Sequence, residues 1–445
     1  MKEKVDLVLI GGTIVTMDTN RRIIENGAVA IRENKILSVD RADTVQEKYT
    51  AEKTIDAKHM AVTPGLIDCH THNLQIFLRG ISWSKPPKVP VWVNVLIPFE
   101  SALKKDEAHL SALLSCINMV KVGTTCHLEH GGQFNADEVG RAVDTTGVRG
   151  ILGTSTVDMG VPENFRTTTE ECVKRNIALV ERWNRVNERI RAWFSLRQII
   201  VDSEELWPKF KELAAKYKVG LQTHLAEGIY EVDYCMAKWG RRPVEHLFDT
   251  GFLGPNVVIA HAMYLTMEEV GMLQQRNVKV AHCPSGNLNR TRVAQMLAQN
   301  VTVGLGSDGG ARRGLDLFRE MRVVSTLNRV SGIPQYDDLP LTDQRIFEMA
   351  TINGAKALLW DKEIGSIEPG KKADIILVNL NKPHIVPVAD IYNTLVQRVT
   401  GPDVDTVIID GKVIMQHGEI KTVNEQEILE KVGQTVPNII RRLGW

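Results

Sequence analysis

Short apolar runs alternate with amphipathic stretches through the middle of the chain. The apolar runs, which are typical of buried strands, lie at residues 147–154, 219–223, 257–260, 278–281 and 301–306. The amphipathic stretches repeat apolar residues at helical spacing and lie at residues 168–184, 204–217, 242–250, 266–275 and 315–329. Alternation of this kind predicts a parallel sheet wrapped by helices. Because about eight units of this size fit residues 61–365, we predict a (β/α)8 TIM barrel there, in the α/β class.

The two ends of the chain have a different texture, with short strands and turns. Strands are predicted at residues 5–10, 13–17, 28–31 and 35–39 near the start, and at residues 373–378, 404–409 and 412–415 near the end. Asp410 and Gly411 between the last two runs are a strong hairpin signal. Since neither set of short strands can bury a core by itself, we predict one small β-sandwich domain built from residues 1–60 and 366–445, with a helical C-terminal tail.

Composition and charge narrow the classes of function. The chain has 445 residues, of which 43% are hydrophobic and 24% charged, as in ordinary globular proteins. Lysine plus arginine and aspartate plus glutamate both number 54, and no basic tract stands out, which argues against a nucleic-acid partner. No apolar run approaches the ~18 residues of a membrane span, so no membrane partner is expected. The charged start lacks the apolar core of a signal peptide and the six cysteines form no CxxC pair, so we expect a cytoplasmic protein.

Histidine and aspartate residues stand at the ends of the predicted barrel strands. His70 and His72 end an apolar strand with one residue between them, and residues i and i+2 of a strand point to the same face. His224, His261 and Asp308 end three later strands. Because the functional residues of such a barrel lie at the carboxyl ends of its strands, we expect these side chains to converge. Three imidazoles and a carboxylate that leave one position open are typical of a catalytic divalent-metal site.

Several other polar residues follow the same strands. Glu227 comes three residues after His224, and a carboxylate there can accept a proton from an activated water and return it to a leaving group. His130 ends the second predicted strand and is a candidate for the pocket wall, whereas His282 is interpreted either as pocket wall or as packing. The GxGxxG pattern at residues 304–309 is not interpreted as a dinucleotide site, because a helical run replaces the second strand that such a site needs.

Six longer motifs carry a resemblance to a known family. They are PGLIDCHTH from residue 64, HLAE from residue 224, VVIAHAMYLT from residue 257, AHCPSGNL from residue 281, VGLGSDGGARRGLDLFREMR from residue 303 and IGSIEPGKKADIILV from residue 364. Together they resemble the amidohydrolase superfamily, and within it the cytosine-deaminase-like branch. That branch includes methylthioadenosine/S-adenosylhomocysteine deaminases, guanine deaminase and triazine hydrolases. The resemblance covers nearly the whole chain.

The resemblance implies a ligand set and a role for each site residue. The implied metal ligands are His70, His72, His224 and Asp308, and the implied catalytic residues are Glu227, His261 and Asp308. Glu227 would shuttle protons, and His261 would polarise the attacked centre. No candidate for a carboxylated lysine is evident, so one divalent ion fits better than two. We expect Zn²⁺, with Fe²⁺ as the alternative because nitrogen and oxygen ligands do not exclude it.

The sequence departs from the adenosine-derivative deaminases near the predicted pocket. Those proteins usually carry His-Ser-Pro after the fourth strand, where this chain has residues 192–198, which include Arg197. Arg312 and Arg313 follow Asp308, where many relatives have a small polar residue. Guanidinium groups donate paired hydrogen bonds to carboxylates or ring carbonyls, so we expect a substrate with a carbonyl or anionic group. The candidate substrate contacts are Trp92, His130, Arg197 and Arg312.

These features predict a metal-dependent aminohydrolase that deaminates an amino-substituted heteroaromatic ring of purine, pterin, pyrimidine or triazine type and releases ammonia. Two alternatives within the family stay open: a triazine hydrolase that displaces chloride or alkylamine, and an adenosine-derivative deaminase. A non-catalytic assembly protein on the same fold is the interpretation outside enzymes, and the complete ligand set argues against it. We expect a small heterocyclic substrate and, from the resemblance, a homo-oligomer.

Overall fold

Two five-stranded parallel sheets form the middle of the chain in a computed structural model that describes residues 2–81, 91–286, 292–311, 314–330 and 341–444. The first sheet has the order β15 (Asp308–Gly309), β6 (Leu66–His72), β7 (Thr124–Glu129), β8 (Arg149–Leu152) and β9 (Ile190–Ala192). The second has the order β10 (Phe194–Gln198), β11 (Leu221–Leu225), β12 (Val257–His261), β13 (Lys279–His282) and β14 (Thr302–Leu305). Their residues are almost all buried, which explains the nearly continuous apolar runs in the sequence.

The two sheets follow one another without a closed ladder of hydrogen bonds. Only Trp193 separates β9 from β10, and Gly306 and Ser307 separate β14 from β15. At the second junction Asp68 in β6 bridges the break, because its carboxylate accepts bonds from the Ser307 amide at 3.0 Å and hydroxyl at 2.5 Å. Burial raises the pKa of Asp68 to about 7. The predicted α/β arrangement is thus confirmed, whereas the described strands form two sheets that are not closed into one barrel.

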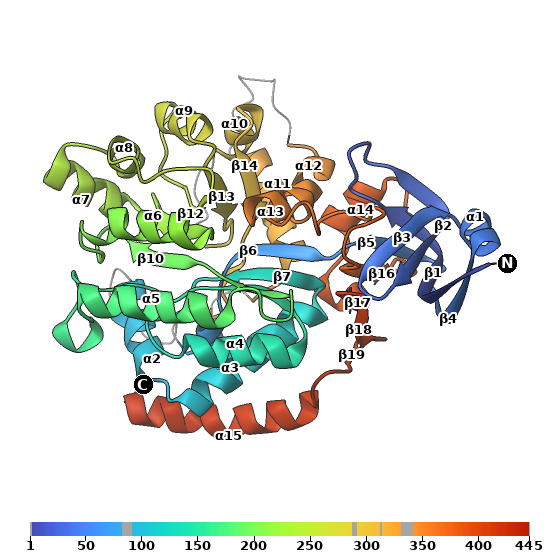
Figure 1. The fold of residues 1–445 in the computed structure, drawn as a ribbon, viewed down its shortest axis with the longest axis horizontal. Helices are drawn as coiled ribbons and strands as arrows, with labels where there is room; N and C mark the ends of the chain where they lie inside the picture. Colours follow the sequence, from blue (N-terminus) through green and yellow to red (C-terminus); the bar gives the residue numbers. More distant parts are fainter. Residues whose placement is uncertain (1, 82–90, 287–291, 312–313, 331–340, 445) are drawn as a thin grey trace.

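Helices surround the two sheets (Figure 1). They include α3 (Lys105–Lys121), α4 (Ala136–Thr146), α5 (Thr169–Trp183), α6 (Leu206–Tyr217), α7 (Ile229–Trp239), α8 (Pro243–Asp249), α9 (Met267–Gln275), α10 (Val293–Ala298) and α11 (Leu317–Val330). Five of these match helical stretches predicted from the sequence, and two of the five begin at a side-chain cap. The Thr168 and Thr266 side chains accept bonds from the Glu171 and Glu269 amides and so cap α5 and α9.

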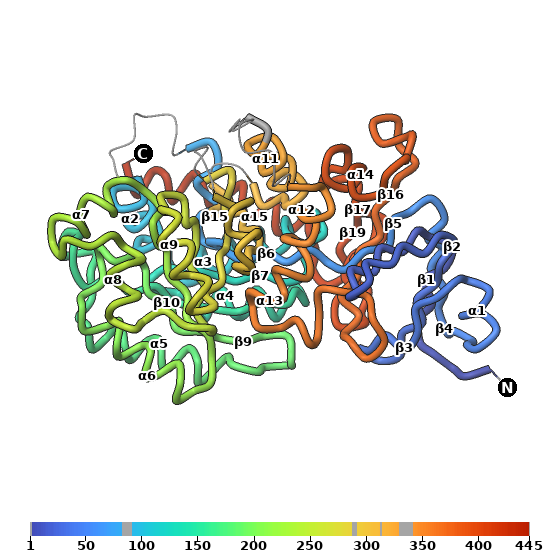
Figure 2. The backbone as a smooth tube through the Cα atoms, turned by 90° about the horizontal axis from the view of Figure 1, so that it is seen from above, coloured from blue at the N-terminus to red at the C-terminus, as the bar shows by residue number. Residues whose placement is uncertain are grey.

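Both chain ends contribute strands to a single nine-stranded sheet (Figures 1 and 2). From the start come β1 (Glu3–Val15), β2 (Ile23–Arg32), β3 (Lys35–Arg41), β4 (Tyr49–Asp56) and β5 (Met60–Pro64). From the end come β16 (Ile375–Asn379), β17 (Val404–Ile409), β18 (Lys412–Gln416) and β19 (Glu419–Ile420). The antiparallel pairing of β5 with β16 joins the two sets. This sheet does not confirm the predicted sandwich, because the described strands form one hydrogen-bonded sheet.

The two separate strands predicted at residues 5–10 and 13–17 are one strand, β1. The register with β2 shifts on either side of Gly12, and the preceding Gly11 has a φ of 88°. The glycine pair therefore forms a bulge that bends the strand without ending it. The chain ends with helix α15 (Glu425–Leu443), which packs on α3 (Figure 1). Within the described residues, no helix combines the length and the apolar character needed to cross a membrane.

A buried ion pair connects the middle of the chain to the nine-stranded sheet. Arg149 in β8 donates to both carboxylate oxygens of Asp374, at 2.7 and 2.9 Å, and to Asp410 at 3.2 Å. Arg149 is 0% exposed. The opposing charges hold the pKa of Arg149 above its usual range despite its burial. A buried charge without its partner is costly, so this pair is sensitive to removal of either side.

Arg149→Met is expected to lower the free energy of unfolding by about 3 kcal/mol, because it leaves the buried Asp374 carboxylate unpaired. Denaturant titration followed by circular dichroism measures the change. The control is Arg182→Met, which breaks an ion pair with Asp137 whose side chains are 54% and 43% exposed. Exposed pairs contribute roughly 0–1 kcal/mol, so equal losses in the two variants would contradict the prediction.

Candidate active site

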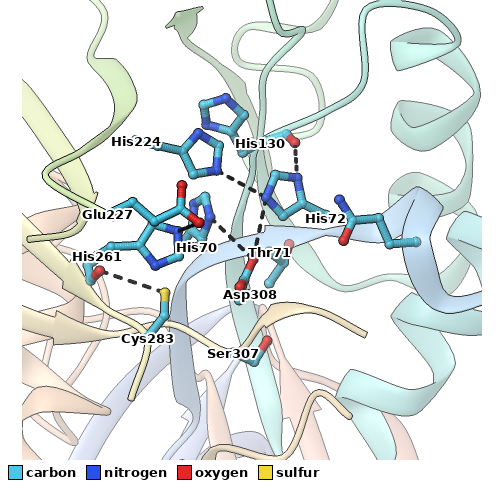
Figure 3. A network of polar contacts seen from close by, with 12 residues as sticks. His70, Thr71, His72, His130, His224, Glu227, His261, Cys283, Ser307 and Asp308 are labelled. Atoms are coloured by element: carbon cyan, nitrogen blue, oxygen red, sulfur yellow. Dashed lines mark hydrogen bonds and ion pairs between the residues drawn. The ribbon is translucent and has the colours of Figure 1, made fainter. Parts of the chain in front are cut away.

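The strand ends bring together the histidines and the aspartate predicted from the sequence (Figure 3). His70 and His72 end β6, His224 lies in β11, and His261 ends the neighbouring β12. Asp308 begins β15, which pairs with β6. Its Oδ1 lies 3.7 Å from His70 Nε2 and 3.5 Å from His72 Nε2. The ring centroid of His70 lies 4.7 Å from the ring centroid of His224 and 5.4 Å from that of His261.

Backbone carbonyls fix the orientation of two of these imidazoles. His72 Nδ1 lies 2.6 Å from the carbonyl oxygen of His130, and His224 Nδ1 lies 2.6 Å from that of Arg197. A carbonyl oxygen only accepts, so each Nδ1 carries the hydrogen and each Nε2 carries a lone pair. The two Nε2 atoms lie 3.2 Å apart. Two lone pairs facing each other at this distance are unfavourable without a cation between them.

This arrangement fits a divalent metal ion. The candidate groups are His70, His72 and Asp308, and His70, His224 and His261, each with ligand atoms within 4.8 Å of one another. His70 Nε2 is buried and has no hydrogen-bond partner within the described part of the chain. Burial lowers the pKa of His72 to about 4 and holds the pKa values of His70 and His224 well below their usual range, so these imidazoles are neutral. Neutral imidazoles with a carboxylate are a typical donor set for zinc.

Four backbone positions at or directly beside the site residues are left-handed. They are Ala226 at a φ of 52°, His261 at 74°, Ala262 at 52° and Asp308 at 63°. Residues other than glycine rarely adopt this backbone conformation. Such residues cluster where the surrounding structure holds a functional group in place. Ala226 follows the end of β11, His261 ends β12, and Asp308 begins β15, so these positions lie where strands meet loops.

Glu227 follows β11 and points toward the histidines (Figure 3). Its Oε1 lies 4.0 Å from His261 Nε2. Its Oε2 accepts hydrogen bonds from Gln198 Nε2 at 2.8 Å and from the Tyr230 hydroxyl at 3.2 Å. Its backbone N–H donates to Glu231 at 2.9 Å. The side chain is therefore held beside the histidine cluster by partners on both the backbone and the carboxylate.

Of the four residues predicted as substrate contacts, some line the cavity and one does not. Trp92 and Arg197 line the same cavity as the histidines and Glu227. Arg197 is buried and donates to Glu100 at 3.1 Å, so its charge already has a partner. His130 is fully buried, its ring centroid is 4.2 Å from that of His224, and it is not among the residues that line the cavity. This position favours support of His224 and His72 over substrate contact. Arg312 and Arg313 lie outside the described residues.

Three further buried residues, Glu129, His282 and Cys69, lie next to the site residues in sequence or in space. Glu129 in β7 accepts from the Asn73 amide at 2.9 Å and the Thr71 hydroxyl at 3.2 Å, and burial raises its pKa to about 8. His282 is buried, and burial together with His261 lowers its pKa to about 3. The Cys69 thiol, between Asp68 and His70, donates to the Gly354 carbonyl at 3.8 Å.

Sequence reasoning missed three residues that contact the site. Gln198 and Tyr230 bind Glu227, and Glu100 pairs with Arg197. The only signals were proximity in the chain: Gln198 follows Arg197 directly, and Tyr230 follows Glu227 by three residues. Glu100 offered none, because α2 (Ile97–Ala102) lies far from β10 in sequence.

Comparisons with known proteins give a consistent result. A model of the amidohydrolase family matches residues 61–414. A 5-methylthioadenosine/S-adenosylhomocysteine deaminase of Thermoanaerobacter pseudethanolicus is 32% identical over 98% of this chain and 100% of its own length. A 5'-deoxyadenosine deaminase of Methanosarcina acetivorans is 33% identical over 98% of this chain and 99% of its own length. The crystal structure of a Xanthomonas campestris adenosine deaminase with bound zinc is 25% identical, covers 99% of both chains and superposes with a TM-score of 0.92.

Proposed function

The chain belongs to the amidohydrolase family, and from this premise we propose that it is a metal-dependent aminohydrolase. It hydrolyses a carbon–nitrogen bond of a cyclic amidine, so that an amino-substituted heteroaromatic ring loses ammonia. The observation that carries the proposal is the pair of Nε2 lone pairs of His72 and His224, 3.2 Å apart beside Asp308 and Glu227. Packing or hydrogen bonding within the protein does not explain why these two nitrogen atoms face each other.

The proposed ligands of one divalent ion are His70, His72, His224 and Asp308. When bound, the ion supplies a Lewis acid that makes water nucleophilic near neutral pH. Glu227 and Asp308 handle the protons: the carboxylates take the two protons of the attacking water in turn and deliver one to the ring nitrogen and the other to the leaving amine nitrogen, which departs as ammonia. His261, which lines the same cavity, would polarise the attacked centre. Zn²⁺ is the proposed ion and Fe²⁺ the alternative, since both accept nitrogen and oxygen donors.

The proposed substrate class is a heteroaromatic ring that carries an exocyclic amine. Names of the curated relatives specify adenosine derivatives, which favours purines among the predicted rings and gives the triazine alternative less support. Arg197 is paired with Glu100, so the two side chains together carry no net charge. A paired guanidinium can still donate to a ring carbonyl, but it offers little attraction to an anion. We therefore propose a carbonyl-bearing or neutral ring in place of an anionic one.

An ammonia-release screen tests this function directly. Protein loaded separately with Zn²⁺ and with Fe²⁺ is assayed on amino-substituted purines, adenosine derivatives, pterins, pyrimidines and triazines. We expect ammonia from at least one class and none from the metal-free protein. Chloride or alkylamine release from triazines without ammonia would favour the alternative hydrolase. A loaded protein that releases nothing from any class would remove the enzymatic proposal.

The proposed finer architecture is a (β/α)8 barrel over residues 61–365 and a small sandwich of residues 1–60 and 366–445. Short gaps between β9 and β10 and between β14 and β15 support the barrel, because only one or two residues separate the last strand of one sheet from the first strand of the other. A shared apolar cluster of Leu9, Ile31, Ile375 and Leu377 supports a sandwich, since strands from both ends bury the same core. A homo-oligomer and a cytoplasmic location stay predictions.

A further inference from the structure

We infer that Gln198 and Tyr230 are positioning residues for the carboxylate of Glu227, and that Trp92 orients the Tyr230 hydroxyl for this task. The inference rests on the proposed function, because it assigns partners to the proposed proton shuttle. It adds Gln198 and Tyr230 to the site and gives Trp92, predicted as a substrate contact, a further task.

The two donors converge on a single oxygen of Glu227. Gln198 Nε2 lies 2.8 Å from Oε2 and the Tyr230 hydroxyl lies 3.2 Å from the same atom. Gln198 Nε2 also donates to the Tyr230 hydroxyl oxygen at 3.4 Å. The other oxygen, Oε1, lies 4.0 Å from His261 Nε2. The two carboxylate oxygens thus have different tasks: Oε2 is anchored, and Oε1 faces the histidine cluster where the reaction is proposed.

The direction of each hydrogen bond follows from donor chemistry. The indole nitrogen of Trp92 lies 2.8 Å from the Tyr230 hydroxyl, and an indole N–H only donates. A phenol has one hydrogen, so its lone pair receives the Trp92 bond and its hydrogen turns toward the acceptor, Glu227. Burial and the charge of Glu227 hold the pKa of Tyr230 above its usual range, which keeps the hydroxyl protonated. The chain of donation therefore runs from Trp92 through Tyr230 to Glu227.

Three different elements hold this network. Gln198 ends β10, where it pairs in register with His224 of β11, and its backbone N–H donates to the buried Asp202 at 3.0 Å. Tyr230 lies in the first turn of α7. Trp92 begins η2 (Trp92–Leu96), which forms part of the cavity wall. Because the anchors come from a strand, a helix and the wall, the carboxylate is held in one orientation before substrate binds, which is the condition for efficient proton transfer.

The test compares Gln198→Leu and Tyr230→Phe with the wild type, both nearly isosteric changes. The control is Tyr234→Phe, one turn further along α7, whose hydroxyl contacts Lys238 at 3.3 Å. We expect kcat to fall about tenfold in each test variant and KM to stay within about twofold, since the group lost acts on the chemical step. Metal content should match the wild type in all three variants. In a Glu227→Gln background neither change should lower kcat further, because both act through Glu227.

A crystal structure of the Gln198→Leu/Tyr230→Phe double variant supplies a readout independent of turnover. We expect the Glu227 carboxylate to rotate away from its wild-type orientation. If the wild type releases ammonia and both variants behave like Tyr234→Phe, the positioning role is wrong while the proposed function stands. If the wild type deaminates no ring, the proposed function fails and the double-variant structure still decides: an unmoved Glu227 carboxylate overturns the inference, and a displaced one supports it.

Discussion

Glu227→Gln is expected to lower kcat by a factor of ~10²–10⁴ while metal content stays at the wild-type level, the range typical of losing a general acid/base. Glutamine keeps the shape of the side chain and its contacts with Gln198 and Tyr230, but its amide cannot carry a proton between water and the leaving nitrogen. Steady-state kinetics on the best substrate of the ammonia screen measures the fall, and elemental analysis measures the metal.

A matched control for this variant is Glu212→Gln, because the Glu212 side chain is 71% exposed on α6 and remote from the site. It should leave kcat unchanged. Turnover near the wild-type value in Glu227→Gln would exclude Glu227 from proton transfer. Loss of metal together with activity would instead assign Glu227 as a ligand.

Removing both histidines of β6, by His70→Ala with His72→Ala, is expected to abolish metal binding and deamination together. The wild type should hold about one divalent ion per chain, since four ligands with an open position describe one catalytic site. Two of those ligands are lost in the variant, and the Asp308 carboxylate loses both neighbouring imidazoles, at 3.7 and 3.5 Å. Elemental analysis after exhaustive dialysis measures the metal, and the ammonia assay measures the activity.

The control for the histidine variant is His417→Ala, whose side chain is 73% exposed and pairs with Asp405 far from the site. It should retain the metal and the activity. The prediction is wrong if the double variant and the wild type contain the same amount of metal. Retained metal with lost activity would point to a different ligand set, with His224 and His261 as the remaining imidazoles.

Local patterns in the sequence were enough for the strands, the helices and the strand-end residues. A parallel strand buried on both faces reads as an apolar run, and its polar side chains appear where it ends. His224 and His261 could therefore be assigned to the same end of the strands before the distance between their side chains was known. Their chemical types also limit the options, because a cluster of histidines and carboxylates at strand ends suits a metal and little else.

The paths of the strands were harder to predict where backbone irregularities intervene. Gly11 and Gly12 resembled a turn, yet they form a bulge within β1. The joining of the chain ends was predicted from their shared need for a core, but the sequence could not show that their strands form one continuous sheet. Sheet continuity depends on which edges meet, and edge pairing is decided by contacts between segments remote in sequence.

What the sequence determined by itself is the class of fold, the family motifs and the residue types at the strand ends, because each is encoded in neighbouring positions. Only the tertiary structure decided which side chains of different strands and helices contact one another. Gln198 and Tyr230 meet on one oxygen of Glu227, and Arg197 is neutralised by Glu100. These contacts join a strand, a helix and the cavity wall, so no periodicity records them. Hydrogen bonds need atoms within about 3 Å, and that precision arises only when the whole core has packed.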